Sequence, residues 1–143
     1  MNIPILAPAA VLVLWSLIML MWVIVTRFPA FANAGLTLDK AEPGMRYQDV
    51  EPTLPADVNW KSHNYTHLME QPTLFYATVA ILALAGQGDG LNLTLAWIYV
   101  GLRICHSLWQ SLINTIPVRI ILFASSTTVL IVMAVNAVRA TVF

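Results

Sequence analysis

Four ionisable side chains lie within otherwise apolar stretches of this chain, and they are the first candidates for chemistry. His67 and Glu70 stand three positions apart in one stretch, and Arg103 and His106 stand three positions apart in another. A three-residue step keeps both members of a pair on one face of a helix. Because an ionisable group inside a bilayer costs several kcal/mol, each is expected to face a partner, a ligand or a water-filled cleft.

The second stretch continues as a polar stripe with steps of four, three, four and four residues: Tyr99, Arg103, His106, Gln110 and Asn114. A polar face on an apolar helix must contact protein or water instead of acyl chains. Its arginine could bind an anionic ligand, since a guanidinium forms a bidentate fork with carboxylates. The alternative is a buried ion pair between Arg103 and Glu70 that only fixes helix packing. No metal site is predicted, because the chain has no H-E-x-x-H motif.

Composition assigns the chain to the membrane proteins. Of its 143 residues, 59% are hydrophobic and only 10% are charged, and the mean hydropathy is +0.75. Soluble domains rarely have this composition. The net charge is zero and no basic cluster occurs, which argues against nucleic acid as a partner. The single cysteine, Cys105, cannot form a disulfide within the chain and is expected to be a small buried hydrophobe.

The elements that must position these residues are four apolar runs, each near the roughly 20 residues that span a bilayer. The predicted fold is an all-α membrane protein, one domain over residues 1–143, with a bundle of four transmembrane helices at about 4–26, 64–85, 91–114 and 118–138. The first run is interpreted as a retained helix, because it lacks the basic start of a signal peptide. Phe28 and Pro29 are expected to end it.

The connections define which helices are neighbours and which side of the membrane they face. A polar loop at about 30–62 holds five of the seven acidic residues, and a glycine-rich turn at 86–90 makes the second and third helices an antiparallel hairpin. Depth in the membrane is counted from the cytoplasmic ends of these two helices, opposite to the turn, at about 1.5 Å per residue. On this count Glu70 lies roughly 10 Å deep and Arg103 roughly 16 Å. Basic residues favour one side by five to one: Arg27, Lys40, Arg46, Lys61 and Arg119 against Arg139. The positive-inside rule then predicts a cytoplasmic 30–62 loop and both termini outside.

Two segments resemble a known family. The run from His67 through Glu70 and Pro72 to Tyr76, followed by the run from Tyr99 through Arg103 to His106 and then by Asn114 and Arg119, is similar to the bacterial branch of the MAPEG family, the membrane-associated proteins in eicosanoid and glutathione metabolism. The predicted four-span plan agrees with it. The resemblance covers nearly the whole chain.

This resemblance implies a homotrimer that holds glutathione in a cleft between subunits near the cytoplasmic side, and that acts as a transferase, peroxidase or isomerase on lipophilic substrates. Glu70 would then hold the amino end of glutathione, Arg103 a carboxylate, and Tyr99 would line the cleft. His67, His106 and Gln110 occupy neighbouring positions of the same cofactor site. A positive charge beside the bound thiol would favour the thiolate.

Several positions depart from the family pattern. His67 stands where the enzymes have asparagine, and Pro72 comes one residue early. His106 and Gln110 replace two tyrosines, and Pro117 replaces the arginine that activates the thiol. Arg119, two residues on, is the candidate catalytic residue in its place, although a basic residue at a membrane boundary can equally be a topological anchor.

Two functions of different class follow. The first is a glutathione-dependent membrane enzyme. The second is a MAPEG-like scaffold without catalysis, which binds membrane lipid or serves as a small subunit of a larger membrane complex. In either case the family branch favours the bacterial inner membrane.

Overall fold

The computed structural model describes residues 3–142, apart from the side chain of Leu38. Over this range the chain is all-helical, with five α-helices, two short 3-10 turns and no strand. In chain order these are α1 Leu6–Asn33, η1 Leu38–Lys40, α2 Tyr47–Val50, η2 Glu51–Thr53, α3 Ala56–Leu84, α4 Gly90–Leu112 and α5 Ile116–Val142.

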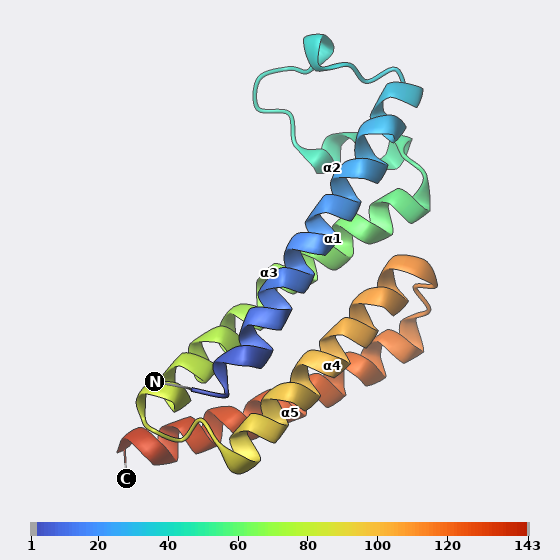
Figure 1. The fold of residues 1–143 in the computed structure, drawn as a ribbon. Coiled ribbons are helices and arrows are strands. Elements are labelled where there is room, and N and C mark those ends of the chain that lie inside the picture. Colours follow the sequence, from blue (N-terminus) through green and yellow to red (C-terminus); the bar gives the residue numbers. More distant parts are fainter. Residues whose placement is uncertain (1–2, 143) are drawn as a thin grey trace.

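The four long helices run antiparallel to their chain neighbours (Figure 1). α1 packs along α3, α4 packs along α5, and contacts of α3 and α4 join the two pairs. The beginning of α1, the α3–α4 turn and the end of α5 gather at one end of the bundle, and the long α1–α3 connection lies at the other. The predicted hairpin of the second and third long helices is therefore confirmed.

The core between the helices is formed by large apolar side chains from all four. Each of the following is fully excluded from solvent: Leu12 and Met19 of α1, Phe75 and Leu82 of α3, Tyr99 of α4 and Met133 of α5. Phe75 and Tyr99 stack with their ring centroids 4.3 Å apart. This stack fixes the α3–α4 interface at the level where the polar residues of the site begin.

Residues in the left-handed backbone conformation end three of the long helices. Gly35 (φ 72°) follows α1, Gly86 (φ 69°) follows α3, and Asn114 (φ 59°) follows α4. Glycine adopts this conformation without steric cost, and asparagine is among the few other residues that tolerate it. These positions, and not the ends of the apolar runs, set where the helices stop.

Two boundaries therefore differ from the sequence predictions. α1 continues through Pro29 to Asn33, so the predicted break at Pro29 is wrong. α3 begins at Ala56, eight residues before the predicted start, and its first turns are stabilised by an ion pair of 3.3 Å between Lys61 and Asp57. Hydropathy marks the level at which a helix leaves the bilayer, whereas the helix itself continues until a residue stops it. The connection between α1 and α3 is correspondingly shorter than the predicted 30–62 loop.

Two of the helices, α1 and α5, are long and apolar enough to cross a membrane by length and composition. α3 and α4 are also long, at 29 and 23 residues, but they carry most of the buried polar side chains. These enclosed polar residues lower the mean hydropathy of α3 and α4.

The hydroxyl of Ser107 ties three helices together and should matter for stability. It accepts hydrogen bonds from Trp15 Nε1 of α1 at 3.1 Å and from Asn64 Nδ2 of α3 at 2.8 Å. Ser107→Ala leaves both donors without a partner, and we expect it to lower the free energy of unfolding by about 1–2 kcal/mol. Reversible SDS unfolding measures this. Ser125→Ala, at an exposed position of α5, is the matched control, and an equal loss in both variants would contradict the assignment.

Candidate functional site

The polar stripe of α4 faces the inside of the bundle, as the sequence predicts. Tyr99 and Arg103 are 0% exposed, Gln110 is 1% and His106 is 2% exposed. Asn114, the last member, lies beyond the end of α4 and is half-buried. The stripe therefore contacts protein, and its partners come from α3 and α5.

Hydrogen bonds connect α3 and α4 at successive levels. Asn64 Nδ2 donates to Ser107 Oγ at one level, Arg103 Nη2 donates to the carbonyl oxygen of His67 at 2.9 Å at the next, and the Tyr99 hydroxyl donates to Gln71 Oε1 at 3.3 Å beyond it. The amide of Gln71 also reaches α5, where Nε2 donates to Thr127 Oγ1 at 2.8 Å. The site is thus anchored to three helices.

Arg103 is the central group, because its charge is enclosed without a counter-charge. Nη2 has the His67 carbonyl, but Nε and Nη1 are buried and have no hydrogen-bond partner among residues 3–142. Its Cζ lies 5.9 Å from the ring centroid of Phe123, a residue of α5 that is 43% exposed. Phe123 therefore covers the guanidinium on the side where α5 meets the surface. A buried, incompletely paired cation is costly, so this arrangement favours an anion from elsewhere.

His67 and His106 flank the guanidinium. His67 Nδ1 lies 3.0 Å from Gln110 Oε1, and the two histidine rings are 6.1 Å apart at their centroids. The other histidine of α3, His63, instead pairs with Glu51 of η2. His63 and His67 stand four residues apart but serve different partners.

Glu70 points away from Arg103's enclosure. Its side chain is exposed on α3, and the ion pairs formed among residues 3–142 are Lys61 with Asp57 and His63 with Glu51. The alternative of an Arg103–Glu70 ion pair within one subunit is therefore wrong. Counted along α3, Glu70 lies fourteen residues, or about 21 Å, from the start of the helix at Ala56.

The exposed face of α3 changes character along its length. The part from residue 63 to residue 73 exposes, beside the apolar Met69, four polar side chains at steps of three, four and three residues: His63, Thr66, Glu70 and Thr73. The C-terminal half of α3 presents Leu74, Ile81 and Leu84. An apolar solvent suits only the second part, so the first needs a polar partner.

Arg119 does not extend toward the surface as a free anchor. It lies in the first turn of α5, where Pro117 is tolerated because the first N–H groups of a helix need no intrahelical acceptor. Its Nη1 donates to Asn114 Oδ1 at 2.8 Å, and its buried Nε has no partner in the described part of the chain. The guanidinium is therefore turned back toward the end of α4.

Three polar residues of the site escaped the sequence analysis: Asn64, Gln71 and Ser107. All are uncharged, so a search for ionisable groups passes over them. A signal was present on α3, because Asn64, His67 and Gln71 repeat at steps of three and four. The expectation for Cys105 is wrong, since this cysteine is exposed on the outer face of α4. The buried, inward-facing positions next to it on α4 are occupied by Arg103 and His106.

The geometry thus describes a helical membrane-associated protein with a buried, polar, cation-centred site between its helices. The profile of the MAPEG family matches residues 5–139. The chain belongs to the MAPEG family. No curated protein and no solved structure matches it significantly.

The left-handed backbone of Asn114, the residue that holds Arg119, can be tested by substitution. Asn114→Gly keeps the left-handed conformation and removes the side-chain acceptor of Arg119, whereas Asn114→Ala also strains the backbone. We expect the alanine variant to be less stable than the glycine variant by about 1 kcal/mol in SDS unfolding. Equal stability of the two variants would mean that residue 114 does not require the left-handed conformation.

Proposed function

We propose that this protein is a glutathione-dependent membrane enzyme, a transferase or peroxidase that acts on lipophilic substrates. The observation that carries the proposal is the buried Arg103 guanidinium, which has two nitrogens without partners and no carboxylate partner among residues 3–142. Membership in the MAPEG family makes a glutathione carboxylate the natural anion for it.

The site would be completed by a second copy of the chain. The polar half of the α3 face, with Glu70 at its centre, is exposed in one subunit. If all four long helices span the bilayer, a lipid-exposed Glu70 would cost several kcal/mol. Packing of subunits into a homotrimer would cover this face and form a cleft along it, which would shield the carboxylate and receive the peptide.

Glu70 and Arg103 differ in how easily glutathione could reach them. Glu70 is open and could accept hydrogen bonds from the ammonium group of the peptide. Arg103 is enclosed, so a carboxylate reaches it only where Phe123 moves aside or where the seam between α3 and α5 opens. His67, His106 and Gln110 would line that path, whereas Tyr99 is occupied by its stack on Phe75 and its bond to Gln71.

Glutathione supplies the nucleophilic thiol when bound, and the protein must favour its thiolate. A cation near the sulfur does this by stabilising the negative form. Arg119 is the candidate, because it is half-buried and held toward the bundle by Asn114. Its Nε, which has no hydrogen-bond partner among residues 3–142, would be a donor for the sulfur.

A second candidate function is a non-catalytic MAPEG-like scaffold, which binds lipid or joins a larger membrane complex. Two observations favour it: Pro117 stands where the family resemblance leads one to expect the activating arginine, and Tyr99 is committed to core packing. In this alternative, Arg103 and its hydrogen bonds only hold α3 against α4.

Arg103→Met separates the two candidates. Methionine keeps the volume and removes a poorly paired charge, so we expect the fold to survive. Glutathione binding by the purified trimer should weaken at least about thirtyfold, the usual consequence of removing one partner of a buried charge pair. Isothermal titration measures the binding. If the unchanged protein binds no glutathione and shows no thiol-dependent activity, the scaffold replaces the enzyme.

Arg119→Gln tests the activating group. We expect kcat/KM for conjugation of glutathione to a lipophilic electrophile to fall about a hundredfold, because a preorganised charge at the reacting atom is lost. The matched control is Arg139→Gln at the far end of α5, which should leave the rate unchanged. Full activity of the Arg119 variant would remove Arg119 from the mechanism.

The proposed topology has four spans, the α1–α3 connection in the cytoplasm and both termini outside, in a bacterial inner membrane. Cysteine labelling tests it in a Cys105→Ser background, which removes the exposed native thiol. An impermeant maleimide applied to intact cells should label a cysteine at Asp89, in the α3–α4 turn, and spare one at Asp49. Labelling of position 49 instead would reverse the orientation.

A further inference from the structure

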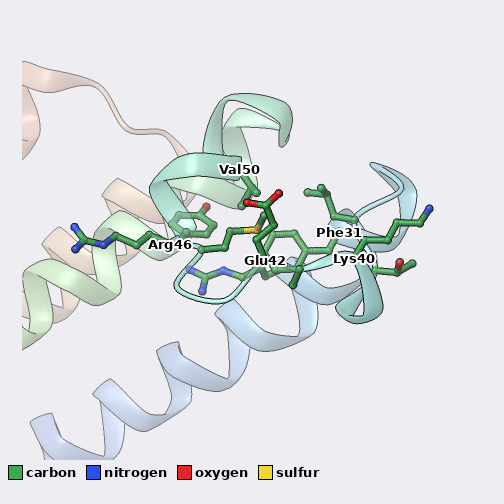
Figure 2. A pocket seen from close by; sticks show the side chains of 11 residues that line it. Phe31, Lys40, Glu42, Arg46 and Val50 are labelled. Atoms are coloured by element: carbon green, nitrogen blue, oxygen red, sulfur yellow. The ribbon is translucent and has the colours of Figure 1, made fainter.

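A second site lies away from Arg103, where the α1–α3 connection folds over the end of α1. A pocket of about 270 Å³ opens there, between the last turns of α1 and the segment from Leu36 to Val50. Figure 2 shows its side chains, with Phe31 between Lys40 and Arg46, which extend to opposite sides. Its walls combine apolar groups with cations.

The cations of this pocket lack acidic partners. Arg27, Lys40 and Arg46 all line it, and none forms an ion pair among residues 3–142. Glu42 is the one acidic residue in the lining. Three of the basic residues of the chain therefore line one hollow, and they outnumber its acidic residue, although the charged ends of Lys40 and Arg46 extend to opposite sides of it.

Three acidic residues in and beside the connection are engaged elsewhere. Asp49 accepts a hydrogen bond of 2.8 Å from the backbone N–H of Arg46, Glu51 pairs with His63, and Asp57 pairs with Lys61. This pattern keeps three carboxylates off the lining. The positive charge is thus a product of how the connection folds, even though the connection as a whole is rich in acidic residues.

Arg27 is the fixed cation among the three. Its Cζ lies 3.9 Å from the centroid of the Tyr47 ring, and Nη2 donates to Ser62 Oγ of α3. Its Nε is buried and has no hydrogen-bond partner within residues 3–142. The guanidinium is therefore held in place on an aromatic face while part of its hydrogen-bonding capacity stays unused.

The position of the pocket along α1 indicates its occupant. Arg27 is the first charge after the apolar run at 4–26, and Trp22, one turn earlier, lies under the Lys61 ammonium with 5.5 Å to its ring. Tryptophans and the first basic residue beyond a span typically lie at headgroup level. Phe31, Met45 and Val50 supply apolar wall at the same site.

We propose that this pocket binds the phosphate headgroup of an anionic membrane lipid. The phosphate would be held near Arg27, with Lys40 and Arg46 adding attraction from the rim, and the first part of an acyl chain would lie against Phe31 and Met45. The volume is below the roughly 300–1,000 Å³ of sites that enclose a whole small ligand, which suits a headgroup whose tails remain in the bilayer. The proposal does not depend on glutathione.

Native mass spectrometry of the full chain, with dioleoyl phosphatidylglycerol and phosphatidylcholine as probes, tests the proposal. We expect phosphatidylglycerol to bind preferentially and the double variant Lys40→Gln with Arg46→Gln to bind it about thirtyfold more weakly, since each basic residue near an anionic surface contributes about fivefold. Both side chains are exposed, so the fold should survive, and an unchanged thermal midpoint verifies this. Arg139→Gln is the matched control and should bind as the unchanged protein does.

Further measurements distinguish a lipid headgroup from a soluble phosphate as the ligand. Glycerol phosphate, the headgroup without acyl chains, should bind much more weakly than the lipid, and Met45→Gln should weaken only the lipid. Equal binding of glycerol phosphate would mean a site for a soluble phosphate and overturn the proposal. Displacement of the lipid by glutathione would assign the pocket to the peptide. Equal binding of both lipids, or of the double variant, would also contradict it.

Discussion

A cation inside an apolar helix bundle is the constraint on which this structure depends. Arg103 is fully buried, and in water its guanidinium would be far more stable than in this interior. The bundle offsets only part of that cost, through one hydrogen bond to the His67 carbonyl and the ring of Phe123. We propose that a bound anion supplies the balance. A buried, incompletely paired cation is the arrangement expected of an anion-binding site.

The surrounding polar residues follow from the same constraint. A buried arginine draws amides, hydroxyls and imidazoles around it, and these need partners of their own, which produces the hydrogen bonds between α3, α4 and α5. On the outside of α3, Glu70 carries the opposite charge and forms no ion pair among residues 3–142. One buried cation and one exposed anion on adjacent parts of α3 and α4 support the proposal that a zwitterionic peptide binds between copies of the chain.

The sequence predicts the parts of this arrangement that repeat with the period of a helix. The stripe from Tyr99 to Gln110 indicates a buried face, and burial confirms it. The ends of the helices are harder to predict from the sequence, because α1 passes Pro29 and α3 starts at Ala56, where hydropathy gives no signal. The absence of an Arg103–Glu70 pair could not be predicted either, since helical spacing fixes a face only to within a broad arc. The fold of the α1–α3 connection, and the cationic pocket that it makes, depends on contacts distant in sequence.

The central claim is that the partners of Glu70 and Arg103 come from outside the subunit, and photo-crosslinking from the polar face of α3 tests it most directly. A benzophenone side chain placed at Thr73, one turn from Glu70 and exposed, would be activated in native membranes. The account predicts covalent adducts between copies of the chain, and fewer of them when glutathione fills the cleft. Adducts to lipid alone, with no species heavier than one 15.8 kDa chain plus the attached lipid, would contradict it.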